Sequence, residues 1–206
     1  MVKIWRVVDD FLSPISSINI GDRVWSLATS PKGCVAVGSA GLYGVPSLAL
    51  LDLHTGTSRD IGAGLRKGAG MLDLSWLDET KLLSCGYDSY ARLWDIRSGT
   101  CVRKWEEPFN EAIYCLSTDN NMTLVCGTAR HGLVRLWDMR HTQPVQMYHV
   151  QHPRIGQSSP VYSVAFDQAN LYVALDQSLN LMSFMHPARP SQGHNHYFRN
   201  KVVHYR

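Results

Sequence analysis

The stretch Tyr90-Ala-Arg-Leu-Trp-Asp-Ile96 returns almost unchanged as Leu133-Val-Arg-Leu-Trp-Asp-Met139. Its two tryptophans, Trp94 and Trp137, are 43 residues apart. A period of ~40–45 residues that ends in a Trp-Asp pair is typical of a repeated unit of four strands. These two segments therefore set the frame in which the rest of the chain is interpreted.

The position of the two tryptophans can be found three more times along the chain. A step of 43 residues back from Trp94 reaches Leu51, inside an apolar run. A step of 45 residues forward from Trp137 reaches Met182, and Trp5 lies 46 residues before Leu51. The repeat therefore covers most of the chain.

Two further apolar runs precede each complete copy of this position. They are short, rich in β-branched and aromatic residues, and separated by Gly, Asp, Asn and Ser, which is the pattern of strands joined by turns. The first runs are 24–27, 71–74, 113–116 and 161–164, and the second runs are 34–38, 81–86, 123–127 and 171–175. No stretch has the 3.6-residue period of an amphipathic helix. The sequence predicts an all-β fold, a β-propeller whose blades have four strands.

The repeats divide the chain into about four blades. The predicted units are a strand of an incomplete blade at 1–8, repeats at 21–66, 67–108, 109–152 and 158–187, and a basic polar tail at 188–206. Propellers have ~4–8 blades, and their terminal repeats need a closing partner. We therefore expect a partial propeller, the C-terminal portion of a longer one, whether it arises as a natural short form, a fragment or a truncated gene model.

The segment Gly86-Tyr-Asp-Ser-Tyr-Ala-Arg-Leu-Trp-Asp-Ile-Arg-Ser-Gly99 resembles the end of a blade in the WD40 family. In that family an Asp six residues before the Trp joins a buried hydrogen-bond network with the indole. The resemblance implies a structural network of Asp88, Trp94, Asp95, Trp137 and Asp138. The third repeat has His131 in the aspartate's place, and the first has an inserted segment at 41–46, so these repeats should close the network differently.

Residues 70–187 are similar to the closing repeats of dactylin-type F-box/WD-repeat proteins, most visibly at 100–109, 113–116, 159–162 and 171–175. This resemblance implies the substrate receptor of an SCF-type ubiquitin ligase, whose F-box binds the Skp1 adaptor and whose propeller holds a protein substrate. We find no Leu/Pro-rich helical F-box segment in the sequence. The alternative is a WD-repeat scaffold with no link to a ubiquitin ligase.

Composition limits the remaining classes of partner. The formal charge is +3, and the last 30 residues contain four basic and no acidic residues, so the rest of the chain is close to neutral. We therefore expect no nucleic-acid partner, and no apolar run is long enough for a membrane span. The five cysteines form no CxxC pair and are interpreted as reduced thiols, which favours a cytoplasmic or nuclear protein.

Catalytic motifs are absent from the sequence, so we predict a non-catalytic protein with no cofactor and no metal. There is no G-x-S-x-G, H-E-x-x-H or phosphate-loop motif. The glycines at 62, 64, 68 and 70 are interpreted as an inter-blade loop, since no strand–helix context surrounds them. His194, His196 and His204 lack nearby Cys or carboxylate ligands for a tetrahedral site.

The predicted binding surface is the rim of the propeller where the innermost strands begin. The candidate residues are Trp25, Tyr87, Tyr114, Arg130 and Tyr162. With only one arginine among them, they suit an apolar or aromatic protein contact better than a phosphate pocket. The alternative is that these aromatic side chains simply pack between blades. Four other tryptophans, Trp5, Trp94, Trp105 and Trp137, are expected in the core.

Overall fold

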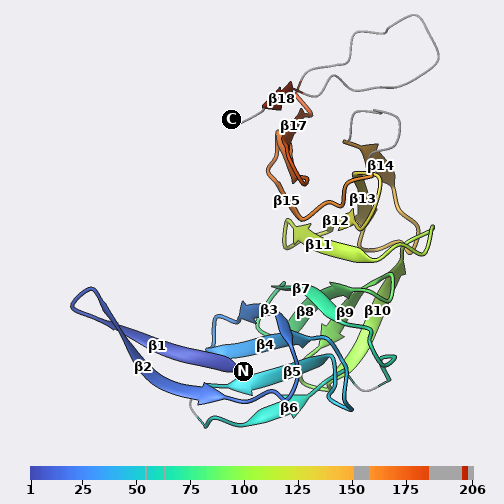
Figure 1. Ribbon diagram of the computed structural model, residues 1–206. Coiled ribbons are helices and arrows are strands. Elements are labelled where there is room, and N and C mark those ends of the chain that lie inside the picture. Colours follow the sequence, from blue (N-terminus) through green and yellow to red (C-terminus); the bar gives the residue numbers. More distant parts are fainter. Residues whose placement is uncertain (54, 63, 151–157, 186–200, 204–206) are drawn as a thin grey trace, which may run out of the picture. The chain divides into compact units, whose positions relative to one another are not determined.

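The computed structural model describes residues 1–53, 55–62, 64–150, 158–185 and 201–203. All regular elements in this part of the chain are β-strands, as the repeat pattern predicted (Figure 1). They form two compact units, Met1–Lys104 and Trp105–Arg206, which are described separately below. Among the described residues, no helix is long and apolar enough to cross a membrane.

The first unit opens with an N-terminal ribbon of two strands. Strand β1 (Val2–Val8) pairs antiparallel with β2 (Phe11–Ile18). Val2 packs with Val35, Val37 and Leu51, but the rest of the ribbon is largely exposed. Trp5 is 48% exposed, so the prediction that it is a core residue is wrong. In the described part of the chain β1 pairs only with β2, so the ribbon is a two-stranded sheet.

Two four-stranded antiparallel sheets complete the first unit, and each is a meander in which sequential strands are neighbours. The first blade contains β3 (Val24–Thr29), β4 (Cys34–Ser39), β5 (Leu48–Asp52) and β6 (Ser58–Asp60). The second blade contains β7 (Met71–Trp76), β8 (Lys81–Gly86), β9 (Tyr90–Asp95) and β10 (Thr100–Glu106), and the unit boundary falls within β10.

The second unit contains two sheets of the same order. The third blade is formed by β11 (Ile113–Thr118), β12 (Thr123–Thr128), β13 (Leu133–Asp138) and β14 (Gln146–His149). The fourth blade is formed by β15 (Ser163–Phe166), β16 (Asn170–Ala174), β17 (Leu179–Ser183) and β18 (Lys201–Val203). Strand β18 lies within residues 188–206, which the sequence analysis expected to be a polar tail. Apart from residues 201–203, the structure describes nothing beyond residue 185.

Neighbouring blades within a unit pack face to face, and the first strand of the following blade (β7 or β15) lies against the first and second strands of the preceding blade. In the first unit one cluster joins Leu48 and Leu50 of the first blade to Met71 and Leu82 of the second. In the second unit Cys115 and Val134 pack with Val164 and Val173 of the fourth blade, among others. Apolar residues on both faces of a strand fit a sheet covered on both sides.

Glycine allows the backbones of neighbouring blades to approach closely at one point in each unit. A Cβ on Gly38 of the first blade would lie 2.7 Å from the carbonyl oxygen of Met71 of the second blade, and one on Gly127 of the third blade would lie 2.4 Å from Val161 Cγ1, ahead of β15. A polar contact accompanies each approach: Ser26 Oγ donates to Met71 O at 3.1 Å, and Cys115 Sγ to Val161 O at 3.4 Å. These contacts set the spacing of the blades within each unit.

Candidate protein-binding site

The innermost strands of three blades carry a β-bulge at the same place. The register shifts lie between Val24 and Ser26, between Met71 and Asp73, and between Ile113 and Cys115. The residues left out of register are Trp25, Leu72 and Tyr114. A bulge re-aims the side chain that it carries, and such bulges are frequent next to binding sites. The second residue of each of these innermost strands is thus the extra residue of a β-bulge, which the sequence pattern did not reveal.

Trp25 and Tyr87 form an exposed aromatic pair in the first unit. Their ring centroids are 5.2 Å apart with an interplanar angle of 73°, which is an edge-to-face contact. The pair lies over Gly70, where a Cβ would be 2.3 Å from the Trp25 ring. Trp25 is 39% and Tyr87 46% exposed, so both rings keep part of their surface for another molecule.

Tyr114 and Tyr162 form a second pair in the second unit, with ring centroids 6.1 Å apart. Tyr162 is 54% exposed, while Tyr114 is half-buried. The Tyr162 hydroxyl is hydrogen-bonded to the Asp176 carboxylate, and this bond raises the pKa of the phenol. The structure therefore brings the five candidate residues together only in part: two aromatic pairs, one in each unit.

Arg130, the fifth candidate residue, is exposed and lies near a carboxylate. Its Nε is 3.7 Å from Glu111 Oε2. An exposed pair of this kind contributes little to stability. The Glu111 carboxylate nevertheless offsets the charge of Arg130, which is the only positively charged residue among the five candidates. The second unit thus presents two tyrosines, one of them hydrogen-bonded to Asp176, and separately the Arg130–Glu111 pair.

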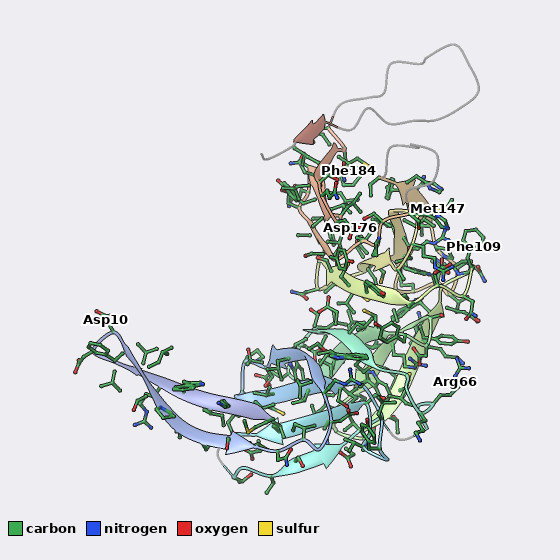
Figure 2. All side chains as sticks on the ribbon, viewed as in Figure 1. Asp10, Arg66, Phe109, Met147, Asp176 and Phe184 are labelled. Carbon is green, nitrogen blue, oxygen red and sulfur yellow. The ribbon has the colours of Figure 1, made fainter. Side chains whose placement is uncertain are left out.

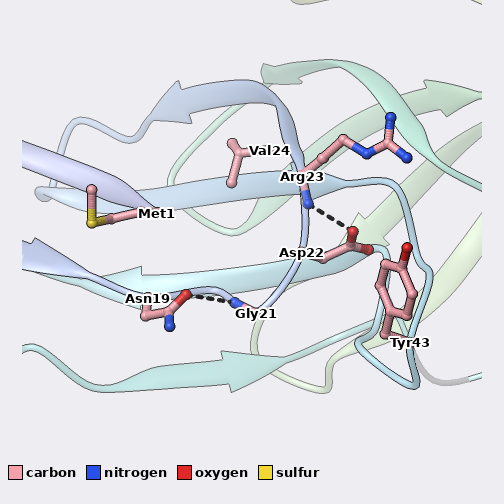
Figure 3. Close-up of a pocket in the computed structure, with 7 residues that line it drawn as sticks. All are labelled: Met1, Asn19, Gly21, Asp22, Arg23, Val24 and Tyr43. Carbon is pink, nitrogen blue, oxygen red and sulfur yellow. Dashed lines mark hydrogen bonds between the residues drawn. The ribbon is translucent and has the colours of Figure 1, made fainter.

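An open hollow of about 570 Å³ lies beside the start of β3 (Figure 3). It is lined by Met1, Asn19, Gly21, Asp22, Arg23, Val24 and Tyr43. Tyr43 belongs to the inserted loop at 41–46, which Asp22 anchors by accepting the Leu42 amide at 2.7 Å. Hydrogen bonds from Ser39 N to Ser47 O (2.9 Å) and from Ser39 Oγ to Pro46 O (3.1 Å) close the neck of the loop.

In the second blade the tryptophan and the turn aspartate have separate partners. The buried Trp94 indole donates to Ser84 Oγ at 2.9 Å. Asp88, also buried, pairs instead with Arg92, whose Nη2 is 2.6 Å from Asp88 Oδ2. Asp88 Oδ1 and Arg92 Nη1 have no hydrogen-bond partner among the described residues. The motif therefore contains two buried pairs where the family resemblance implied one connected network.

The third blade closes its core differently, as the histidine in the aspartate's place led us to expect. Cys126 stands opposite Arg135, where the second blade has Ser84 opposite Arg92. Without a serine hydroxyl there, the buried Trp137 indole has no hydrogen-bond partner among the described residues. His131 has a positive φ of 62°, and its amide donates to Ser158 Oγ at 3.0 Å.

Arg135 of the third blade forms a buried ion pair that the sequence analysis missed. Its Nε and Nη2 donate to Glu107 Oε1 at 2.9 and 2.7 Å, and both side chains are almost fully buried. Glu107 Oε2 accepts the amides of Phe109 and Glu111 at 2.7 and 3.0 Å. The guanidinium also lies 4.8 Å from the ring centroid of Phe109, which is labelled in Figure 2. The sequence did contain a hint of this ion pair, because an arginine stands two residues before the tryptophan in both copies of the motif.

The aspartates that follow the tryptophans stabilise turns at the strand ends. Asp95 Oδ1 accepts the Arg97 amide at 2.9 Å, and this bond is the main reason that the pKa of Asp95 is lowered. Asp138 accepts from the side chain of Arg140, at distances from 2.6 to 3.1 Å, and from its amide at 2.9 Å. The Arg140 guanidinium holds the pKa of Asp138 well below its ordinary value.

The residues weighed for metal or phosphate binding do not form a site in the described part of the chain. No cluster of three or more His, Cys, Asp or Glu side chains suited to a metal occurs there. His194, His196 and His204 lie outside the described residues. The glycines at 62, 64, 68 and 70 lie between β6 and β7, two strands of neighbouring blades.

The four-stranded meanders and the repeated Trp-Asp strands are similar to those of WD-repeat proteins. A family model, "WD domain, G-beta repeat", matches residues 67–95 and 99–138, which contain β7 to β13. The predicted all-β WD40 fold is thus confirmed. Proteins built from such repeats are generally non-catalytic scaffolds.

Within this class the chain is similar to F-box/WD repeat-containing protein 4. The Mus musculus protein is 38% identical over 190 residues, which is 90% of this chain and 46% of the relative. The Homo sapiens protein is 36% identical over the same shares of both chains. The chain therefore spans about half the length of these curated relatives, and the predicted resemblance to F-box/WD proteins is confirmed.

A solved structure of the computationally designed Ika4 protein has a similar fold. Its TM-score is 0.62 at 20% sequence identity, and the match covers 81% of this chain and 95% of that chain. At this identity the likeness concerns the fold alone.

Proposed function

We propose that this chain is a protein-binding scaffold, the substrate-binding propeller portion of an F-box/WD receptor in an SCF-type ubiquitin ligase. The observation that carries this proposal is the 38% identity to F-box/WD repeat-containing protein 4 of Mus musculus across 90% of the chain. The F-box named in that relative binds the Skp1 adaptor in ligases of this type, while the WD repeats hold the substrate. Such a receptor acts in the cytoplasm or the nucleus.

The two aromatic pairs are the proposed contact residues for the substrate. Protein interfaces draw most of their binding energy from a few aromatic or arginine side chains that become buried. Trp25 with Tyr87, and Tyr114 with Tyr162, are held in place by contacts within the protein yet remain partly exposed. Because Arg130 already lies near Glu111, we propose a substrate segment with apolar or aromatic anchors and without a required phosphate.

The ligase link is tested by affinity purification of this chain beside a form extended upstream through its own transcript. Skp1 and cullin are scored by mass spectrometry. We expect both proteins with the extended form, because the adaptor binds through an F-box. If neither form captures the adaptor, the ligase assignment fails, and a WD-repeat scaffold unrelated to ubiquitin transfer remains.

The contact residues are tested with the double variant Tyr114→Ala, Tyr162→Ala. Proteins captured by the unmodified chain should be lost by the double variant, while its thermal unfolding should change little because Tyr162 is exposed. The matched control is Phe184→Ala, which removes an exposed aromatic ring of the same unit that lies outside the proposed surface. A large fall in melting temperature with capture retained would show that the tyrosines serve packing.

A further inference from the structure

The Tyr114–Tyr162 pair of the second unit has an exposed carboxylate attached to it. Tyr162 donates its hydroxyl hydrogen to Asp176, whose side chain is exposed and labelled in Figure 2. Among the described residues, no lysine, arginine or histidine forms an ion pair with this carboxylate. Arg130 lies near Glu111 instead. The aromatic pair therefore has beside it a negative charge that no described basic side chain neutralises by direct contact.

The repeat explains why this aspartate has no basic partner in its own blade. Asp176 has in the fourth blade the position that Asp88 has in the second, six residues before the tryptophan position. The buried Asp88 pairs with Arg92, but the fourth blade has Asn180 where the second has the arginine. The side-chain amide of Asn180 carries no charge, and it donates to Ser178 Oγ at 3.3 Å. The fourth blade is thus left with a turn aspartate that is exposed at the surface.

Hydrogen bonds to two blades hold this group of side chains in place. The residue before Tyr162, Val161, donates its amide to Thr128 O of the third blade at 2.9 Å. The amide of Tyr162 donates to the last residue of β16, in the fourth blade, at 3.0 Å. The Asp176 amide donates to Ser159 Oγ at 3.1 Å. Because the backbone is already fixed, a ligand loses little binding free energy to ordering it.

The faces of aromatic rings and a carboxylate attract the same kind of ligand, which is a cation. The face of a tyrosine ring is negative and attracts a lysine or arginine side chain within about 6 Å of its centroid. This chain contains such contacts already, since Arg92 and Lys104 lie 4.9 and 5.0 Å from the ring centroid of Tyr90. An anionic ligand such as a phosphate would be repelled by Asp176. The chemistry of the site therefore favours a positively charged side chain.

We propose that Tyr114, Tyr162 and Asp176 bind a basic side chain, lysine or arginine, of the protein substrate. The aliphatic part of that side chain lies on the two rings, and its charged end lies at the carboxylate. This inference rests on the proposed function, in which the tyrosine pair contacts the substrate, and it adds the charge of the residue that the pair selects. The Trp25–Tyr87 pair, whose neighbouring Asp88 is buried and already paired, takes the apolar or aromatic anchor.

The test uses the full chain with 13C-labelled tyrosine rings, whose NMR signals are assigned with Tyr114→Phe and Tyr162→Phe. The probes are blocked tripeptides with lysine, arginine or norleucine between two glycines, and norleucine keeps the aliphatic stem of lysine without its charge. The lysine and arginine peptides should shift the Tyr114 and Tyr162 signals saturably, and the norleucine peptide should not. Asp176→Asn should weaken binding by about three-fold or more, because it removes the charge and keeps the shape.

The matched control is Asp167→Asn, at a second carboxylate of the same unit that accepts a tyrosine hydroxyl. Tyr172 donates to Asp167 at 3.2 Å, but no other described ring pairs with Tyr172. This variant should bind the basic peptides as the native chain does. The dispersion of the tyrosine signals shows whether each variant is folded.

Three results would overturn the proposal. They are equal shifts with the norleucine peptide, equal affinity of the native and Asp176→Asn chains, and a shift of the Tyr172 signal as large as that of Tyr162. The probes are synthetic peptides, so such a result leaves capture of Skp1 by the extended form unaffected. Failure of that capture equally leaves the peptide result unaffected, and the two proposals can therefore fail separately.

Discussion

At the scale of single residues, the two arginines of the repeated motif show that the same buried positive charge can be paired with carboxylates from two different places in the chain. Arg92 pairs with Asp88, four residues earlier in the turn of its own blade. Arg135 has a histidine in that turn and pairs with Glu107, 28 residues away. Both arginines lie within apolar strands, where an unpaired charge is costly. The motif therefore requires a carboxylate but does not fix its place in the sequence.

Glu107→Gln should destabilise the second unit strongly. The change leaves the buried Arg135 guanidinium without its counter-charge, and breaking a buried pair in this way costs about 3–5 kcal/mol. The free energy of unfolding is measured by denaturant titration. The neighbouring Glu106→Gln is the matched control, because Glu106 is exposed, and it should change stability by less than about 0.5 kcal/mol. Equal effects of the two changes would show that the ion pair does not stabilise the fold.

At the scale of strands, the bulges and the close glycine contacts place neighbouring blades relative to each other within a unit. Within the second blade, the tight spacing at Gly86 lets the Tyr87 amide reach the carbonyls of Ala69 and Gly70 at 3.1 and 3.2 Å, just before β7. The same segment holds the Tyr87 ring against Trp25. Blade packing and the exposed aromatic pair are therefore parts of one arrangement.

Gly86→Ala should destabilise the first unit and loosen the Trp25–Tyr87 pair. The new methyl group would lie 2.2 Å from Gly70 O and 2.8 Å from Ala69 O, and backbone atoms cannot move aside cheaply. Overpacking of this kind costs about 1–3 kcal/mol. The comparison variant is Gly44→Ala, at a glycine with a φ of 78° and open space around it, which should show only the backbone strain of ~1 kcal/mol. Chemical denaturation ranks the two variants, and a larger effect at Gly44 would contradict the packing argument.

At the scale of the whole molecule, the turn aspartates set a lower pH limit for stability. The amide of Ala169 lowers the pKa of Asp167, and the Arg140 side chain lowers that of Asp138. Because these pKa values lie below those of the unfolded chain, the unfolded state takes up protons first as the pH falls. Stability is therefore complete above about pH 5 and is lost progressively below about pH 4.

Thermal unfolding between pH 7 and pH 2.5 checks this dependence. The melting temperature should fall steadily below pH 4 in the native chain. It should fall less in the double variant Asp138→Asn, Asp167→Asn, which begins lower at neutral pH but has two fewer groups to protonate. A melting temperature that stays constant from pH 5 to pH 2.5 would mean that these turns contribute nothing.

Much of the fold could be predicted from the sequence because the repeat marks each strand several times. Strand β2 was missed because Phe11–Ile18 contains Pro14 and three serines and matches no other copy. The exposure of Trp5 was missed because its motif position is buried in β9 and β13. The Arg135–Glu107 pair joins residues far apart in the chain, and no local pattern specifies such a contact. The aromatic candidates were chosen by repeat position, whereas their pairing depends on how the blades pack.

The loop between β4 and β5 offers a place to attach a reporter to this protein. Its neck is closed by the hydrogen bond between Ser39 and Ser47, and at its tip a side chain on Gly44 would meet nothing within 4 Å. Tyr43 beside it is 79% exposed. A short epitope or dye-labelling tag inserted after Gly44 would therefore extend into solvent without pulling on the strands below, because the cost of a longer closed loop grows only slowly with length. A chain labelled there keeps both aromatic pairs unmodified for the binding measurements described above.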